Sequence, residues 1–257
     1  MPLPRAHWSV IDVGGRPCEM HAPPNPAAGR AVIFLHDACE RRLVDMPALA
    51  ELFEEHRLPV LGPRAGRSWW LDRLVPAFDP HVTPERHVVE AVRGEVGRRF
   101  GVQPPGIAVV GIGMGGQAAL RIAYRHPTIF PVTAAIAPAI DFHRGMREAG
   151  DRDDGESYDV LWQLFGDVER ARQETAILHV HPLNWPRHQF FASDPADLHW
   201  HDGAARLHGK LVALGIPHVA LLEPRVGVPG VRFEDEVAPA AIRFVLEALD
   251  QESRRLA

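Results

Sequence analysis

Residues 106–127 decide the fold of this chain; they read Gly-Ile-Ala-Val-Val-Gly-Ile-Gly-Met-Gly-Gly-Gln-Ala-Ala-Leu-Arg-Ile-Ala-Tyr-Arg-His-Pro. The unbroken apolar run from Ile107 to Val110 is typical of a buried strand. After Met114, apolar residues recur at helical spacing, and a glycine-dense turn lies between the two segments. This order fits the pattern G-x-S-x-G, in which a strained turn lifts a nucleophilic serine above a sheet. Here Gly113 stands at the serine position.

The rest of the chain predicts a sheet built around this turn. Residues 8–21 predict an edge hairpin, and the apolar run 31–35 is typical of a parallel strand covered on both faces. Further strands are expected at 59–61, 130–139, 188–193 and 218–222, and helices at 46–57, 84–100, 203–214 and 234–249. Strands and helices alternate from residue 31 onward. We therefore expect an α/β fold with a mostly parallel sheet of about eight strands and helices on both faces.

The length of the chain favours a single domain. A chain of 257 residues suits one large α/β domain, residues 1–257. Residues 145–175 are polar and form the least sheet-like part of the sequence. A small cap or lid insertion made of short helices is expected there.

The composition excludes several classes of partner. The net charge is −5 and no block of Lys or Arg exists, so neither nucleic acid nor a membrane is expected as a partner. The N-terminus has no apolar signal segment, and no stretch approaches the ~18 apolar residues of a membrane span. Cys18 and Cys39 form no disulfide framework, although a single bridge between them stays open. We expect a cytoplasmic protein with reduced cysteines.

Three segments together resemble one protein family. Residues 111–117, Gly-Ile-Gly-Met-Gly-Gly-Gln, resemble the G-x-S-M-G-G turn of the esterase D / S-formylglutathione hydrolase-like carboxylesterases, which have the α/β-hydrolase fold. Residues 194–197, Asp-Pro-Ala-Asp, and the helix after them resemble the loop that bears the catalytic acid. Residues 213–230 resemble the strand and loop that deliver the catalytic histidine. The order serine, acid, histidine is the one expected of this fold.

The resemblance implies a degenerate catalytic triad. Gly113 stands at the nucleophile position, Asp197 at the acid position and Pro229 at the histidine position. The chemistry needs a hydroxyl that attacks, an imidazole that takes its proton and a carboxylate that orients the imidazole. Glycine and proline supply neither of the first two groups. Two losses at separate positions indicate natural decay or repurposing, and glycine also relieves the strain of the turn.

A binding site is still expected at this turn. The backbone N–H of Met114 is expected to face the oxyanion position, with a second N–H from the loop after His36. That loop reads His36-Asp37 where the family has His-Gly. Trp69 and Trp70 lie in a loop at the carboxyl edge of the sheet, where ligands of open α/β sheets bind. The two tryptophans are expected either to line a pocket or to pack their loop onto the helices.

Metal binding is a weaker alternative. His179 and His181 alternate, as do His199 and His201, so each pair would share one face of an extended segment, as zinc ligands can. No H-E-x-x-H motif or Cys/His cluster is present in the sequence, and the resemblance implies no metal. We therefore expect structural histidines, with no metal and no cofactor.

Two further chemistries are disfavoured. Cys39 beside His36 could replace the nucleophile, but a reactive cysteine needs electropositive neighbours, whereas Asp37 and Glu40 are acidic. The glycines of residues 111–116 fit the letters of a dinucleotide-binding fingerprint. No acidic residue closes a second strand about 20 residues later, as that fingerprint requires.

The leading functional hypothesis is a catalytically silent, esterase-like pseudoenzyme that keeps a pocket for a small ester- or acyl-like ligand. The alternative is an active carboxylic-ester or acyl hydrolase with rearranged residues, for instance His181 or His143 supplying a base to an activated water. A third expectation is pairing, either as a homodimer or with an active paralogue.

Overall fold

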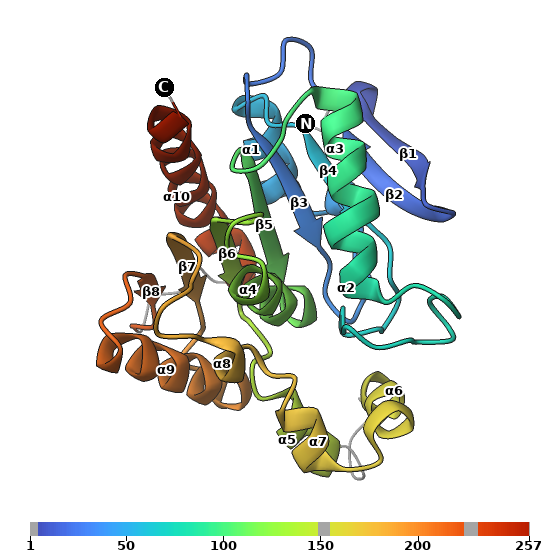
Figure 1. The fold of residues 1–257 in the computed structure, drawn as a ribbon, viewed down its shortest axis with the longest axis vertical. Coiled ribbons are helices and arrows are strands. Elements are labelled where there is room, and N and C mark those ends of the chain that lie inside the picture. The colour runs from blue at the N-terminus through green and yellow to red at the C-terminus, as the bar shows by residue number, and fades with distance from the viewer. Residues whose placement is uncertain (1–4, 149–154, 224–230, 257) are drawn as a thin grey trace.

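The computed structural model describes residues 5–148, 155–223 and 231–256. Its centre is an eight-stranded sheet in the order β1-β2-β4-β3-β5-β6-β7-β8 (Figure 1). β2 pairs antiparallel with β1 and with β4, and all other neighbours are parallel. The strands are β1 Trp8–Val13, β2 Arg16–His21, β3 Ala31–Leu35, β4 Val60–Pro63, β5 Ile107–Ile112, β6 Val132–Ile136, β7 His188–Ala192 and β8 Val219–Leu221. The predicted fold class is confirmed.

Ten α-helices accompany the sheet in the described part of the chain. They are α1 Pro47–Glu55, α2 Pro84–Arg86, α3 Arg93–Phe100, α4 Met114–Arg125, α5 Phe142–Glu148, α6 Gly155–Phe165, α7 Val168–Arg172, α8 Ala176–His179, α9 Leu198–Ala213 and α10 Phe233–Leu256. A π-helical segment, η3 His87–Val92, joins α2 to α3, and 3-10 turns precede β1 (η1 Arg5–His7) and α1 (η2 Leu43–Asp45). Among these described helices, none combines the length and the apolar character that a membrane crossing requires.

Alternate residues of the central strands pack on opposite faces of the sheet. In β3, Ile33 and Leu35 belong to the core under η3, α3 and α4, whereas Val32 and Phe34 belong to the core under α1 and α10. Successive side chains of a strand point to opposite faces. An unbroken apolar strand therefore supplies both cores, which is why the apolar runs predict the central strands correctly.

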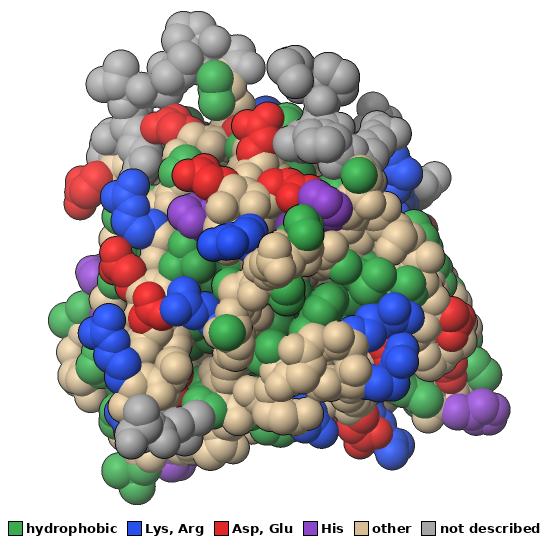
Figure 2. Space-filling model, turned by 90° about the horizontal axis from the view of Figure 1, so that it is seen from above, with side chains coloured by type: hydrophobic (Ala, Val, Ile, Leu, Met, Phe, Trp, Pro, Cys, Tyr) green, Lys and Arg blue, Asp and Glu red, His purple; other side chains and the backbone are tan. Residues whose placement is uncertain are grey.

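Four short helices, α5 to α8, connect β6 to β7. In Figure 1, α5, α6 and α7 lie beyond the end of the sheet to which the arrowheads of β3 and β5 point. The carboxyl edge of the parallel strands therefore faces these helices. Figure 2 views the molecule from the opposite end, where acidic and basic side chains are interleaved around a hydrophobic area.

Several predicted boundaries are wrong. α9 begins at Leu198 rather than at residue 203. The residues of its first turn, His199, Trp200 and His201, do not follow the helical spacing of apolar residues that predicts the start of the helix. α10 continues to Leu256 rather than ending at residue 249, because buried Glu252 holds its charged last turns through ion pairs with Arg187 and His188. The strand predicted at 130–139 is limited to Val132–Ile136.

The two cysteines are free thiols. Cys18 is buried in β2 and Cys39 is exposed, so no disulfide joins them. Burial raises the pKa of the Cys18 thiol to about 12, which keeps it protonated and unreactive.

Candidate active site at the turn after β5

Gly113 is the single residue between β5 and α4, and its backbone has a positive φ, with φ 56° and ψ −117°. Its N–H donates to the carbonyl of Ile136 at 3.0 Å. Its carbonyl accepts from the N–H groups of Gln117 and Ala139, both at 3.0 Å. Residues with a side chain avoid this conformation, and glycine adopts it without strain. The sharp turn predicted from the sequence is therefore present, and glycine relieves its strain.

Two neighbouring glycines allow α4 to approach the sheet closely. A Cβ at Gly111 would collide with the carbonyl of Gly115, and a Cβ at Gly115 would collide with the carbonyl of Leu35. At Gly113 the situation differs, because a Cβ there would lie 3.4 Å from the Cβ of Asp37, an ordinary contact. A side chain at position 113 would therefore have room and would point toward Asp37.

The turn forms the floor of a cavity of about 250 Å³. The loop after β3, the loop after β4, the turn itself, the loop after β6, α6 and α9 all contribute to its lining. The lining residues are Asp37, Ala38, Cys39, Trp69, Gly113, Met114, Ala139, Tyr158 and Trp200. Among the described residues, no serine and no histidine lines this cavity. The structure thus brings Asp37, Trp69, Gly113 and Met114 together, as the sequence suggests.

Met114 begins α4 and lines the cavity beside Gly113. The N–H groups in the first turn of a helix have no acceptor within the helix, and they carry the positive end of its dipole. The first hydrogen bond of α4 runs from the N–H of Gln117 to the carbonyl of Gly113. The N–H of Met114 is therefore available to a polar ligand atom, which is the arrangement of an oxyanion site.

The carboxylate of Asp37 is held by an arginine. Arg41 Nε donates to Asp37 Oδ2 at 2.7 Å, and the same guanidinium donates to Glu234 Oε1 at 2.7 Å. Glu234 lies in the first turn of α10. These ion pairs tie the loop after β3 to α10 and offset the negative charge beside Gly113.

Trp69 and Trp70 both have positive φ angles, 54° and 53°. Bulky residues rarely adopt this conformation, and each instance costs roughly 1 kcal/mol or more. The ring of Trp69 lines the cavity and packs against Phe142 at 4.9 Å and Tyr158 at 5.8 Å between centroids. Trp70 is fully buried behind it. One tryptophan is thus a wall of the cavity, and the other packs the loop.

His36 lies behind the cavity and has a bracing role. Its Nε2 accepts from the N–H of Ala65 at 3.1 Å, so its proton is on Nδ1, which donates to the carbonyl of Asp37 at 2.7 Å. Its own carbonyl accepts from Trp70 Nε1 at 3.3 Å. Burial lowers the pKa of His36. With both nitrogens engaged, His36 has no lone pair to offer a nucleophile at Cys39 or elsewhere.

Buried polar contacts connect α4 to neighbouring helices. Arg121 is 1% exposed and forms ion pairs with Glu85, of the same exposure, and with Glu174 at 2.5 Å. The side chain of Gln117 accepts from the N–H of Ala176 at 2.8 Å and donates to the carbonyl of Glu174 at 3.2 Å. These contacts join α4 to α2 and to the start of α8.

Asp197, His143 and His181, which the sequence offers as acid or base, do not line the cavity. Asp197 is exposed at the N-terminus of α9, and its side chain caps no N–H there. Pro229 lies outside the described residues. His143 is buried, and its pKa is lowered to about 4 by burial and by the charges of Arg144 and Arg172. His181 is exposed, and its Nδ1 accepts from the N–H of Leu183 at 3.1 Å.

Sequence reasoning missed Tyr158 and Trp200 as cavity residues. Tyr158 comes from the polar segment in which no site is expected, and Trp200 lies between His199 and His201, which suggest a metal site instead. One feature of the sequence could have indicated these two residues: both are isolated large aromatic residues in polar surroundings. None of the alternating histidine pairs belongs to a metal-like cluster in the part of the chain that the structure describes.

A family comparison matches residues 19–206 to the Esterase family, described as "Putative esterase". This match covers more than half of the chain. No protein of curated function matches the sequence.

Several solved structures have a similar fold. An S-formylglutathione hydrolase from Agrobacterium tumefaciens has a TM-score of 0.70 at 16% identity, over 94% of each chain. FphF, a fluorophosphonate-binding serine hydrolase of Staphylococcus aureus, has a TM-score of 0.66 at 13% identity, over 93% of this chain and 98% of that one. MPT51 (FbpC1) of Mycobacterium tuberculosis has a TM-score of 0.61 at 13% identity, over 93% and 97%. The chain belongs to the Esterase family and has the α/β-hydrolase fold.

Proposed function

We propose that this protein is a catalytically silent member of the Esterase family that binds a small, uncharged ester- or acyl-like ligand at the turn after β5. One observation carries the proposal. Gly113 has the conformation and place of a nucleophile, and the described residues around its cavity offer neither a hydroxyl from serine nor an imidazole. Without these groups, the attack by a serine and the proton transfer by a histidine cannot occur.

The walls of the cavity support the ligand class. Trp69, Tyr158, Trp200 and Ala139 present aromatic and apolar surface, which suits an acyl chain. The N–H of Met114 offers a donor for a carbonyl oxygen. The volume of about 250 Å³ lies below the range typical of drug-sized ligands, which favours a short chain.

The decisive experiment restores the two lost groups. We expect the native protein to hydrolyse p-nitrophenyl acetate and butyrate no faster than the buffer does. The double variant Gly113→Ser, Pro229→His should hydrolyse them measurably, because a serine side chain has room at position 113. The matched control is Gly113→Ala, Pro229→His, which makes the same change at Pro229 and the same kind of backbone change at Gly113 but adds no hydroxyl. It should stay silent.

Ligand binding is tested separately through tryptophan fluorescence, since Trp69 and Trp200 line the cavity. Ethyl butyrate should alter the emission of the native protein, and Trp200→Phe should reduce that response. Native turnover that persists in Cys39→Ala would overturn the silent-enzyme proposal. His143→Asn, His181→Asn and Asp197→Asn would then locate the base and acid of an active hydrolase. An absence of any fluorescence response would contradict the binding role.

A further inference from the structure

Three potential metal ligands meet far from the cavity. His7 ends the turn before β1, His21 ends β2, and Glu54 lies in the last turn of α1. One nitrogen of each imidazole and one carboxylate oxygen of Glu54 lie within 4.8 Å of one another. Within residues 5–148, 155–223 and 231–256, this is the one group of three or more His, Cys, Asp or Glu side chains that meets so closely.

His21 presents a buried nitrogen without a hydrogen-bond partner. The residue is 0% exposed, and its Nδ1 donates to the carbonyl of Leu58 at 2.8 Å. That bond leaves the lone pair on Nε2, which lies 3.2 Å from Glu54 Oε2 in a direction that makes no hydrogen bond. A backbone carbonyl on the second nitrogen is the usual partner of a metal-binding histidine. The ring of Trp8 stacks on His21 at 4.7 Å and fixes its orientation.

His7 and Glu54 complete the group from the solvent side. His7 Nδ1 lies 3.0 Å from Glu54 Oε1 and 3.1 Å from Oε2. The side chains of His7 and Glu54 are 33% and 18% exposed, so an ion can reach the buried nitrogen between them. His21 Nε2 and Glu54 Oε2 lie 3.2 Å apart with no hydrogen bond between them, and a cation bound to both would give the buried nitrogen a partner.

We propose that His7, His21 and Glu54 form a binding site for a divalent transition-metal ion, with Zn²⁺ as the best fit. Tetrahedral zinc with bonds of about 2.0–2.1 Å holds its ligand atoms about 3.3 Å apart. The separations of 3.0 and 3.2 Å already approach this value. Two imidazoles and one carboxylate suit zinc and its neighbours, whereas Mg²⁺ and Ca²⁺ prefer oxygen ligands only. Three protein ligands leave one position for water.

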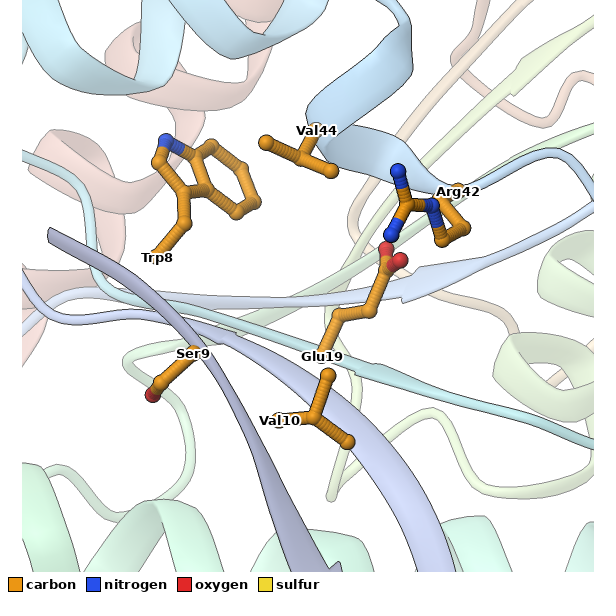
Figure 3. A pocket seen from close by; sticks show the side chains of 6 residues that line it. All are labelled: Trp8, Ser9, Val10, Glu19, Arg42 and Val44. Atoms are coloured by element: carbon orange, nitrogen blue, oxygen red, sulfur yellow. The ribbon is translucent and has the colours of Figure 1, made fainter. Parts of the chain in front are cut away.

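The site has a structural role, because it lies at the opposite edge of the sheet from the cavity. His21 pairs with Val60, the first residue of β4, whereas Gly113 follows the last residue of β5. A bound ion would join the edge hairpin to α1. Trp8 also lines a separate cavity of about 140 Å³ beside this hairpin, with Glu19 and Arg42 on its other walls (Figure 3).

The test measures metal binding to the purified full chain after dialysis against EDTA. Calorimetric titration with ZnCl₂ should give one tight site per chain, and Co²⁺ should give the visible absorption of a tetrahedral ion. Glu54→Gln and His7→Ala should each weaken Zn²⁺ binding about tenfold or more. Mutation of a residue that only hydrogen-bonds to a metal ligand already lowers metal affinity by that much. Zn²⁺ should raise the melting temperature of the native protein by several degrees, but not that of Glu54→Gln.

The matched control is His81→Ala, which removes an exposed loop histidine and should leave the affinity unchanged. Binding that His7→Ala and Glu54→Gln do not weaken would overturn the proposal, because it would come from scattered surface histidines. An absence of binding would overturn it too, and the contact between His21 and Glu54 would then be a polar contact without a metal. Circular dichroism establishes whether both variants are folded. If Glu54→Gln unfolds, His7→Ala still tests the site, because it alters a partly exposed residue.

Discussion

Gly113 matters for stability as well as for chemistry. A side chain at this position would have room, but the φ of 56° would strain its backbone. We expect Gly113→Ala to lower the free energy of unfolding by about 1–3 kcal/mol, the usual cost of such a conformation. Gly209→Ala is the control. Gly209 is exposed within α9, has open space where a Cβ would lie and has no positive φ. That change should stabilise by about 0.5–1 kcal/mol. Urea unfolding measures the free-energy change of both variants. Equal changes at Gly113 and Gly209 would contradict the expected backbone strain at Gly113.

His143 should make the protein less stable in mild acid. Its pKa is about 4 in the folded state, against 6.5 ordinarily, because it is buried beside arginines. Between these pH values the unfolded chain binds more protons, so this contribution to stability is complete above pH 6.5 and decreases as the pH falls toward 4. We expect the loss of unfolding free energy between about pH 7 and pH 5 to be smaller in His143→Asn than in the native protein. His81→Asn should show the native loss, and an equal loss in all three proteins would contradict this role.

The helix α4 depends on one buried charge pair. Glu85 and Arg121 are each 1% exposed, and Arg125 and His126 also contact Glu85. We expect Glu85→Gln to destabilise by about 3 kcal/mol, because it leaves a buried arginine short of one partner. Glu90→Gln, in η3, breaks an exposed ion pair with Arg86 of α2 and should cost less than about 0.5 kcal/mol. Thermal unfolding compares the two. A small cost at Glu85 would mean that Glu174 alone compensates Arg121.

The central strands could be predicted because they are buried on both faces. Such a strand is an unbroken apolar run, which can be recognised from its own residues without knowledge of the surrounding structure. β3 and β5 are such strands, and the glycines after β5 mark the turn. The conformation of Trp69 and Trp70 could not be predicted, since residues of that size take positive φ only when tertiary packing forces them. The first turn of α9 escapes prediction for a similar reason. Its Trp200 faces the cavity rather than following an apolar stripe.

At the scale of the whole molecule, sites assemble from segments that only the fold brings together. Gly113, Asp37, Trp69 and Met114 are predictable because ligands of open α/β sheets gather at the carboxyl edge. The cluster of His7, His21 and Glu54 is not predictable, because His7 and Glu54 are 47 residues apart in sequence and come from different elements. Spacing rules favour the alternating histidines instead, and among the described residues these belong to no group of three or more possible metal ligands.

The two edges of the sheet should behave as independent parts of the molecule. Gly113 lies at the carboxyl edge and Glu54 at the amino edge, with the buried strands between them. In EDTA, the effects of Gly113→Ala and Glu54→Gln on the free energy of unfolding should therefore add to within about 0.5 kcal/mol. Glu85→Gln and Arg121→Met are the matched contrast, because their side chains touch, and they should couple by about 1 kcal/mol or more. Urea unfolding of the single and double variants gives both cycles. Coupling as large in the first pair as in the second would mean that the sheet transmits strain from one edge to the other, and a ligand in the cavity would then alter metal affinity.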